Sequence, residues 1–388
     1  MQHKARSFSE LPDAEWATGL LADIADAPCP FAPVKADRPL ALYGAGNLGR
    51  LARDFLKAVG HDFAFVIDRD AVRAAREPDW VGGRILPLEQ VTETDRHNVR
   101  LAVCVVLSPY VPIERALSAA GFVDIVPFFD LAENFRHAHP LSNGWFAPPL
   151  SGNDRAKAAE VLLRWDDDIS RAHHLQFLAW RCMREEWTFE RAPHPKEPRF
   201  FIADVAEALG EREVYVDAGA YHGVVIADFL AQTHGRFRQI VAIEPDRSSR
   251  ALLTKNLPMD SRVTVMDTAL SDREGSVTFH EGLGYASQIS NTGKLQIIAR
   301  PLDALGLEPT FIKLHLEGGE LAALNGARET LLEHRPIIAA TVYHNDDGIW
   351  RTPLWLMEAL PDYKYLFRAH SWCGTGAVVY GIPEERRV

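Results

Sequence analysis

The sequence predicts an α/β protein with two successive domains, each built on a mostly parallel sheet. Apolar, strand-like runs alternate with helical stretches from Pro39 to Phe129, and the alternation resumes at Val214. The stretch between them is rich in Trp, Pro and charge, and the 388 residues exceed what one hydrophobic core usually supports. The expected segments are a helical extension (1–36), a smaller α/β domain (37–136), a helical linker (137–212) and a second α/β domain (213–388).

The strands and helices of both domains are predicted from these runs. In the smaller domain, LALYGA, FAFVID, RLAVCVVL and DIVPFF are strand-like, and LGRLARDFLKAV and PIERALSAAG are helical. In the linker, HHLQFLAWRCMREEW is the best helix candidate. The second domain has seven strand-like runs: VYVDAG, QIVAIEP, VTVMDTAL, TFIKLHLEG, RPIIAATVYH, KYLFRAH and GAVVYGIP. The short SWCGT turn between the last two runs predicts a terminal antiparallel hairpin on a mostly parallel sheet.

Composition excludes several classes of protein. The formal charge of −11, from 53 acidic and 42 basic residues without a long basic run, argues against a nucleic-acid partner. The scattered cysteines show neither metal-site nor disulfide spacing, which predicts a reducing compartment and no structural zinc. They are Cys29, Cys104, Cys182 and Cys373. The N-terminus lacks a signal-peptide core, and no apolar run reaches the roughly 18 residues of a membrane span. We expect a soluble cytoplasmic protein without a membrane partner, and a homo-oligomer stays open.

A glycine-rich loop in the smaller domain predicts a nucleotide site of the Rossmann type. Gly44, Gly46 and Gly49 form GxGxxG between a strand and a helix. Asp68 ends the next strand 24 residues after Gly44, a separation at which an acid reaches a ribose hydroxyl. A structural or dimerising role is the alternative, since a helix that packs tightly against a strand needs similar glycines. For the whole protein, an NAD-dependent nucleotide-sugar oxidoreductase or epimerase is the main alternative, although the domain lacks a second mononucleotide-binding half.

The loop that opens the second domain predicts a different ligand. Asp217 ends the strand before Gly219 and Gly223, where a carboxylate would repel a pyrophosphate and attract a cation. S-adenosylmethionine carries an ammonium and a sulfonium group, so we expect this cofactor. Glu244 ends the next strand, 25 residues after Gly219, and is placed to accept hydrogen bonds from ribose hydroxyls. The remaining cofactor-binding candidates are Ala220 and Tyr221 in the loop and Asp267, Thr268 and Ala269 along the adenine.

From Val214 onward the sequence resembles the FkbM family of S-adenosylmethionine-dependent methyltransferases. The resemblance rests on VDAGAYHG, IVAIEPD, TALSDREGSVTF, RPLDAL, FIKLHLEGGELAALNGA and VYH, in this order. It implies the seven-stranded class I methyltransferase fold and a hydroxyl acceptor on a sugar or sugar-containing metabolite. Tyr221 stands where the family usually has Asn, and His315 where it usually has Asp. The matching residues of the second segment are Lys313, Glu317, Gly318 and Glu320. The smaller domain is similar to nucleotide-sugar-binding modules of sugar-modifying enzymes.

The candidate catalytic residues are His315, Glu317 and His344. The two histidines follow neighbouring strands, so both should face the carboxyl edge of the sheet, and either is placed to act as a general base. Glu317 is a candidate for holding the substrate, and we expect no metal because one carboxylate does not make a metal site. The segment HEGLGYASQISNTGK is expected to form a lid over the acceptor. A non-catalytic sensor or scaffold, with Tyr221 and His315 marking a lapsed site, is a further alternative.

Overall fold

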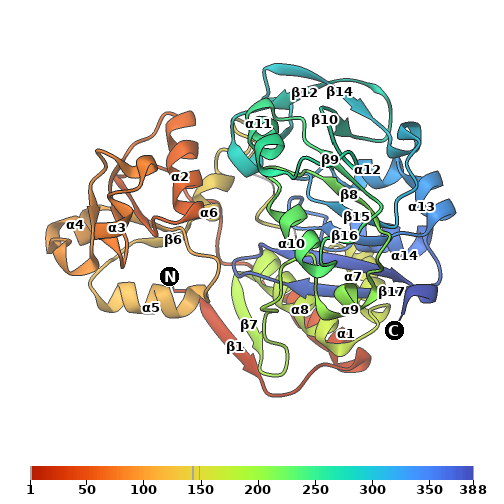
Figure 1. The fold of residues 1–388 in the computed structure, drawn as a ribbon. Coiled ribbons are helices and arrows are strands. Elements are labelled where there is room, and N and C mark those ends of the chain that lie inside the picture. Colours follow the sequence, from red (N-terminus) through yellow and green to blue (C-terminus); the bar gives the residue numbers. More distant parts are fainter. Residues whose placement is uncertain (1, 142–143, 148, 388) are drawn as a thin grey trace.

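The second α/β domain is centred on the expected seven-stranded sheet. The computed structural model describes residues 2–141, 144–147 and 149–387 (Figure 1). The strands are β8 (Val214–Ala218), β9 (Gln239–Ile243), β10 (Val263–Met266), β15 (Phe311–Leu314), β16 (Ile337–Thr341), β17 (Tyr363–Ala369) and β18 (Ala377–Pro383). Their spatial order is β10-β9-β8-β15-β16-β18-β17. Five strands are parallel, and β17 and β18 form an antiparallel hairpin whose strand β18 pairs with β16. The seven predicted strands and the terminal hairpin are confirmed.

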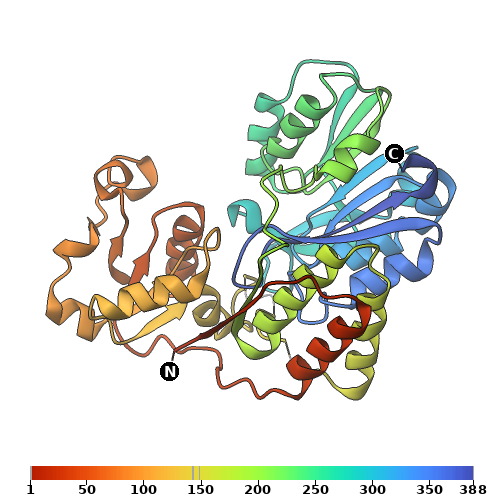
Figure 2. The ribbon, with the colours of Figure 1, turned by 90° about the horizontal axis from the view of Figure 1, so that it is seen from below.

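Helices cover both faces of this sheet, which explains its apolar sequence. The central strands β8, β15 and β16 read VYVDA, FIKL and IIAAT, and every residue in them is buried. The covering helices are α1 (Ala14–Asp26), α7 (Gly152–Leu163), α8 (Asp168–Met183), α9 (Ala203–Ala208), α10 (Val224–Gln232), α11 (Arg247–Asn256), α12 (Glu320–Asn325), α13 (Arg328–His334) and α14 (Arg351–Ala359). Figure 2 shows the green α10 and α11 on one face and the yellow α7 and α8 with the red α1 on the other.

The N-terminal extension and the middle region belong to this domain rather than forming a separate arm and linker. The extension starts with β1 (Lys4–Phe8), which pairs in parallel with β7 (Glu185–Phe189), and α1 packs against α8. Helix α8 packs on the hairpin, where the rings of Trp165 and Phe177 lie 5.5 and 5.9 Å from that of Phe367. The purely helical description of these segments therefore needs correction. We call this assembly of residues 2–26 and 151–387 the main domain.

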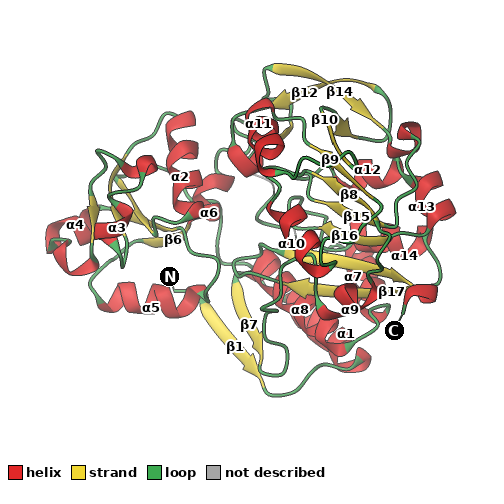
Figure 3. Ribbon diagram, in the orientation of Figure 1, coloured by secondary structure: helices red, strands yellow, loops and turns green. Residues whose placement is uncertain are grey.

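The smaller domain, residues 37–136, carries its own parallel sheet and is inserted into the main domain. Its strands are β2 (Leu40–Tyr43), β3 (Phe63–Ile67), β4 (Ile85–Leu86), β5 (Arg100–Val103) and β6 (Ile125–Pro127), in the order β4-β3-β2-β5-β6. Its helices are α2 (Asn47–Ala58), α3 (Ala71–Ala74), α4 (Glu93–Asn98), α5 (Tyr110–Ala119) and α6 (Phe128–Glu133). Helices flank the strands in both domains (Figure 3). The four strands expected here are present, and β4 is an additional one. We call this unit the front domain.

A small second sheet in the main domain was not foreseen. It has the order β11-β14-β12-β13, and the strands are β11 (Ala269–Leu270), β12 (Gly275–His280), β13 (Gln288–Ile289) and β14 (Leu295–Arg300). The remaining short 3₁₀ turns are η1 (Pro78–Trp80), η2 (Leu88–Gln90), η3 (Gly284–Ala286), η4 (Leu302–Leu305) and η5 (Glu384–Arg386). Within the described part of the chain, no helix combines the length and apolar character needed to cross a membrane.

Buried polar contacts fix the front domain against the main domain. Asp130 of α6 forms an ion pair with Arg184, which follows α8, at 3.1 Å, and both side chains are almost fully buried. The carboxylate of Glu186 in β7 accepts hydrogen bonds from the first backbone N–H groups of α5, at 2.5 and 3.2 Å. Buried charges of this kind are costly unless they are paired, so they favour one relative placement of the two domains.

Candidate active site

A cavity of about 700 Å³ lies between the two domains. The main domain contributes residues that follow β8, β9, β15 and β16, and the front domain contributes residues that follow β2, β3 and β5. These are the carboxyl ends of parallel strands, where ligands bind in open α/β sheets. The two glycine loops identified in the sequence therefore face one common cavity.

The loop after β8 is shaped by close contacts with the next strand. Gly219 has φ +76°, and a Cβ at this position would overlap the carbonyl oxygen of His315. Its N–H donates to the carbonyl of Ile243 at 3.0 Å, which ties the loop to β9. Tyr221 also lies in the left-handed region, at φ 49°, a conformation that Asn adopts more readily than Tyr. Gly219, Ala220 and Tyr221 line the cavity, as expected for cofactor-binding residues.

Glu244 follows β9 and presents its carboxylate to the same cavity. Its two oxygens accept the N–H groups of Tyr221 at 2.7 Å and Asp246 at 2.8 Å. The side chain is almost fully buried, and this burial raises the pKa of Glu244 to about 7 although the two N–H groups oppose the shift. A buried carboxylate with such a raised pKa favours ligands that donate hydrogen bonds to it, such as vicinal ribose hydroxyls.

Asp217 does not face the ligand as the sequence suggested. The residue is fully buried and does not line the cavity. Lys313 of β15 pairs with it at 2.9 Å and also donates to the carbonyl oxygens of Ala218 and Gly219, at 3.3 and 2.7 Å. Burial raises the pKa of Asp217, and Lys313 opposes this shift. The direct attraction of a cationic ligand by Asp217 is therefore wrong, since Lys313 compensates the charge and the carboxylate instead fixes the loop.

Two further cofactor candidates also lie outside the cavity. The Asp267 side chain is 79% exposed and points to Arg250, 3.8 Å away. Gly223 begins α10, and a Cβ there would meet the side chain of Leu253, so it serves packing. By contrast, Thr268 and Ala269 line the cavity, and the Thr268 hydroxyl donates to the carbonyl of Ile298 at 2.9 Å. Two of the three residues predicted to lie along the adenine therefore line the cavity.

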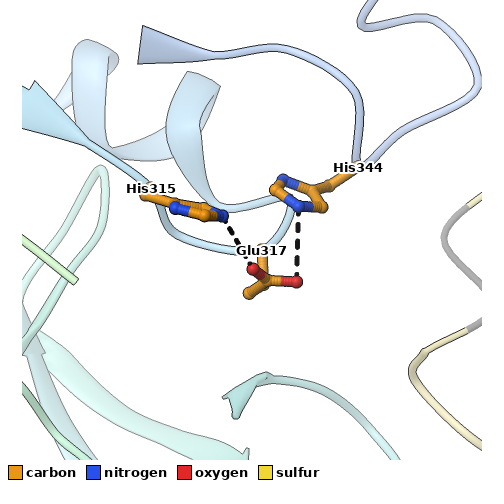
Figure 4. A group of neighbouring side chains, drawn as sticks. All are labelled: His315, Glu317 and His344. Atoms are coloured by element: carbon orange, nitrogen blue, oxygen red, sulfur yellow. Dashed lines mark ion pairs between the residues drawn. The ribbon is translucent and has the colours of Figure 1, made fainter. Parts of the chain in front are cut away.

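The structure brings His315, Glu317 and His344 together on the cavity wall (Figure 4). The Nε2 atom of His315 lies 3.0 Å from Oε1 of Glu317, and the Nε2 atom of His344 lies 3.4 Å from Oε2. Both imidazoles thus point at one carboxylate from the ends of neighbouring strands. Burial lowers the pKa of His315 to about 4, although Glu317 opposes this shift. The three predicted catalytic residues form a single cluster, which we call the His–Glu–His cluster.

Glu320, at the start of α12, orients this cluster from behind. Its Oε1 lies 3.3 Å from Nδ1 of His344 and accepts the hydroxyl of Thr341 at 2.6 Å. The backbone N–H groups of Leu316 and Gly318 donate to its two oxygens, each at 2.9 Å. Although burial opposes ionisation, hydrogen bonds from His344, Thr341 and the backbone lower the pKa of Glu320 to about 2. Glu320 is therefore a fixed anion that sets the ring orientation of His344.

The front loop also reaches the cavity. Gly44, Gly46 and Asp68 line it, and the carboxylate of Asp68 accepts the N–H groups of Ala45 and Asp70, each at 2.8 Å. Helix α2 begins directly after Gly46, which provides no side-chain cap. Gly49 does not line the cavity: a Cβ there would overlap the carbonyl of Gly44. Three of the four candidates thus face the cavity, and Gly49 allows the helix to pack closely on the strand.

Sequence reasoning missed Arg199 and Tyr343. Arg199 is half-buried, lines the cavity, and forms no ion pair with any carboxylate among the described residues. Its guanidinium donates to the Tyr343 hydroxyl at 3.4 Å, which lies 3.3 Å from Nε2 of His315. Arg199 stands in the proline-punctuated segment EPRF, where no pattern indicates a ligand-binding residue.

The segment predicted as a lid does line the cavity, through Gly284, Tyr285, Ser287, Gln288 and Ile289. Asp246 fastens it: one carboxylate oxygen accepts the N–H of Gly282 at 2.9 Å and the hydroxyl of Ser287 at 2.8 Å. Burial opposes ionisation, but these hydrogen bonds together with those from α11 lower the pKa of Asp246 to about 2. Asp246 follows Glu244 by two residues, so the segment is held close to the end of β9.

Comparison with known proteins identifies the main domain. Residues 217–367 match the model of the methyltransferase FkbM domain, which confirms the family resemblance for this segment. No curated protein matches the chain. The region is therefore a methyltransferase domain of the FkbM type, and the NAD-dependent alternative is not favoured.

One solved structure matches nearly the whole chain. A methyltransferase FkbM from Methylobacillus flagellatus KT is 19% identical, with a TM-score of 0.62 over 95% of this chain and 100% of its own. An SAH-bound methyltransferase from Podospora anserina is 14% identical, with a TM-score of 0.31 over 67% of this chain and 98% of its own. A precorrin-6y C5,15-methyltransferase from Geobacter metallireducens GS-15 is also 14% identical, with a TM-score of 0.29 over 49% and 93%. The first of these supports the class I methyltransferase fold for this chain.

Proposed function

We propose that this protein transfers a methyl group from S-adenosylmethionine to a hydroxyl of a nucleotide-linked sugar. The observation that carries the proposal is the single cavity shared by the two domains, since a cofactor at one glycine loop and an acceptor at the other can meet in it. The FkbM-type domain supports the reaction class, and the front domain supports the substrate class.

The residues at one end of the cavity fit S-adenosylmethionine. Glu244 is buried, acidic and open to the cavity, as binding to ribose hydroxyls requires, and Thr268 and Ala269 follow the next strand. The Gly219 loop lies so close to the backbone carbonyl of His315 that no Cβ fits, which fixes the backbone of the loop at the cavity wall. When bound, the cofactor supplies a methyl group on a positively charged sulfur. The task left to the protein is to align the acceptor and to exclude water, which the enclosing position between two domains serves.

The His–Glu–His cluster marks the acceptor end of the cavity. A hydroxyl acceptor must lose its proton as the new bond to carbon forms, and imidazole and carboxylate groups are suited to assist this loss. His315 is the more accessible histidine, with 19% of its side chain exposed against 3% for His344. The cluster lies beside the Gly219 loop, since His315 contacts Gly219 directly.

An anionic group on the acceptor explains the remaining features of the cavity. Arg199 offers a guanidinium that no carboxylate among the described residues pairs with, and guanidinium groups bind phosphate well. The uncapped start of α2 after Gly46 presents backbone N–H groups, while Asp68 is placed for a ribose hydroxyl. A sugar that carries a nucleoside diphosphate combines these groups with a hydroxyl for methylation.

Calorimetry and a transfer assay test the proposal. S-adenosylmethionine, its demethylated product and NAD are titrated separately into the protein, and we expect binding of the first two only. Radiolabelled methyl transfer is then measured to free sugars and to the same sugars linked to nucleoside diphosphates. We expect transfer to the nucleotide-linked acceptors at much lower substrate concentrations. Binding of NAD alone would contradict the reaction class, and equal transfer to free sugars would contradict the substrate class.

A further inference from the structure

We propose that His315, Glu317 and His344 bind a divalent first-row metal ion that coordinates the acceptor hydroxyl. The binding of the ion stands on the geometry of the cluster alone, whereas its role in methyl transfer rests on the function proposed above. The sequence by itself argues against a metal because it offers one carboxylate. The fold adds two imidazoles to that carboxylate and so completes a set of three ligands.

The distances in the cluster suit a metal ion. One ligand atom from each residue can be chosen so that all three lie within 4.8 Å of one another. The two nitrogen-to-oxygen separations are 3.0 Å for His315 and 3.4 Å for His344. An ion with bonds of about 2.1 Å to two ligands holds their atoms about 3.0–3.4 Å apart in octahedral or tetrahedral geometry. The two contacts reach different oxygens of Glu317, so a single ion requires the carboxylate to rotate and the two imidazoles to move closer together.

Glu320 provides the support that metal-binding histidines usually have. Nδ1 of His344 lies 3.3 Å from Oε1 of Glu320, which also accepts the hydroxyl of Thr341 and the N–H of Leu316. Because Nδ1 faces Glu320, Nε2 is the ring nitrogen that faces the cluster. A carboxylate behind a coordinating imidazole fixes the tautomer and the ring orientation in this way.

The two imidazoles approach one carboxylate from opposite sides of the cluster. Nε2 of His344 lies 3.4 Å from Oε2 of Glu317, while its Nδ1 faces Glu320. Nε2 of His315 lies 3.0 Å from Oε1 of the same carboxylate. A metal ion held by Glu317 is therefore within reach of both Nε2 atoms.

The backbone at the cluster is held in an unusual conformation. Glu317 has φ 52°, in the left-handed region that residues other than Gly, Asn and Asp rarely adopt, and Gly318 follows with φ +103°. Such backbone strain is tolerated mainly where the surroundings hold a functional group in place. Here the N–H of Gly318 donates to Glu320, so the turn that carries Glu317 is fixed by the same residue that orients His344.

Three protein ligands leave open positions on the side of the cavity. Two imidazoles and one carboxylate are typical of sites for Mn²⁺, Fe²⁺, Co²⁺ or Zn²⁺, and the remaining positions accept substrate oxygens. With the three side chains engaged as ligands, the ion would assist proton loss in their place. A coordinated hydroxyl would lose its proton to solvent more readily, and its oxygen would form the bond to the methyl carbon while the carbon–sulfur bond breaks. The electron pair of that bond stays on the sulfur, which becomes a neutral thioether.

Direct metal titration tests the inference without any methyl transfer. After treatment with a chelator, the full-length protein is titrated with Mn²⁺ and the free ion is followed by electron paramagnetic resonance, with Zn²⁺ as a competitor. We expect one Mn²⁺ per chain. Glu317→Gln should weaken binding by more than about 100-fold, and Glu320→Gln by about 10–100-fold, the usual cost of removing an orienting partner. His344→Gln should also abolish tight binding.

Two further variants keep the result interpretable. His234→Asn changes an exposed histidine of the same domain and should bind Mn²⁺ like the wild type. His315→Asp replaces an imidazole by a carboxylate, so it should still bind Mn²⁺ and gain affinity for Mg²⁺. Unchanged Mn²⁺ binding in the His344→Gln variant, or no binding to the wild type, overturns the inference. Titration of each variant with S-adenosylmethionine shows whether it is folded and tests the proposed function separately.

Discussion

The two glycine loops of this protein share one backbone geometry and differ in the strand that lies beside each. Gly44 donates to the carbonyl of Ile67 at 2.8 Å, and Gly219 donates to that of Ile243 at 3.0 Å. An acid follows the strand that carries each of these isoleucines, Asp68 after β3 and Glu244 after β9. Each acid accepts one N–H from the glycine loop and one from the residue two positions after itself. Each loop therefore holds an acid in a corresponding position, and in the proposed function each acid binds a ribose.

The two loops differ in the residues carried by the neighbouring strand, which is β5 in the front domain and β15 in the main domain. Strand β5 pairs with β2 in the front domain, as β15 pairs with β8 in the main domain. The register sets Leu42 beside Ala102, where the main domain has the buried ion pair of Asp217 and Lys313. Beyond the strand end, Cys104 and Val106 occupy the places of His315 and Glu317. In the proposed function, the front loop holds a ligand, whereas the main loop adds the groups that act on one.

The largest expected effect comes from breaking the ion pair that only the main domain has. Lys313→Met leaves the carboxylate of Asp217 buried without a partner, so we expect the free energy of unfolding to fall by about 3–5 kcal/mol. Urea unfolding measures this change. As a control, Arg238→Met removes an exposed pair with Glu308 and should cost less than about 1 kcal/mol.

The double variant Asp217→Asn/Lys313→Met completes this test. It removes both charges, and we expect it to recover most of the stability lost by Lys313→Met. If the double variant is no more stable than Lys313→Met alone, the lysine stabilises the loop through its hydrogen bonds to the carbonyl groups of Ala218 and Gly219 rather than through Asp217.

An intermediate effect is expected at the ribose-binding acid of the main domain. Glu244→Gln keeps the shape of the side chain but removes its charge, and hydrogen bonds to a charged group contribute about 1.5–3 kcal/mol. We therefore expect S-adenosylmethionine to bind about 10–100-fold more weakly in calorimetry. Affinity within threefold of the wild type would show that Glu244 does not hold the cofactor.

The raised pKa of Glu244 adds a pH dependence to the same measurement. Since the pKa of this carboxyl is about 7 in the free protein, it is protonated in acid and ionised in base. Ribose hydroxyls favour the ionised form, so affinity should rise by up to about tenfold per pH unit below pH 7 and level off above it. Glu244→Gln should flatten this part of the pH profile.

The smallest expected effect lies in the front domain. Asp68→Asn should raise the KM for a nucleotide-linked acceptor by about tenfold, because one hydrogen bond to a charged group is lost. The affinity for S-adenosylmethionine should stay unchanged. Initial-rate kinetics measure both. Asp62→Asn, at an exposed position of the same domain, serves as the matched control. An equal loss of affinity for the cofactor would mean that the two loops do not divide the ligands between them.

The sequence predicted the elements whose residues are buried on both faces. The strands VYVDA and IIAAT could be predicted without knowing which strands pair with them, because long apolar stretches are typical of central parallel strands. The strands KARSF and EEWTF carry charges and pair across more than 170 residues, so no local pattern indicated them. The two-residue strands β4, β11 and β13 are too short to show any periodicity.

The sequence predicted those site residues whose positions are determined by the end of a strand alone. Glu244, His315 and His344 face the cavity because each directly follows the end of a parallel strand or lies within three residues of it. The role of Asp217 depends instead on the register between β8 and β15, which sets Lys313 beside it. Arg199 reaches the cavity from an irregular segment, so its position follows from tertiary packing alone.

The insertion of the front domain has a consequence for synthesis on the ribosome. Strand β1 and helix α1 leave the ribosome before the front domain, yet their partners β7 and α8 follow only after the whole front domain has emerged. The front domain can complete its own parallel sheet in the meantime, whereas the first 26 residues must wait with an apolar helix face exposed. Deletion of the front domain therefore calls for an internal excision, because removal of the N-terminus would take α1 from the core it completes.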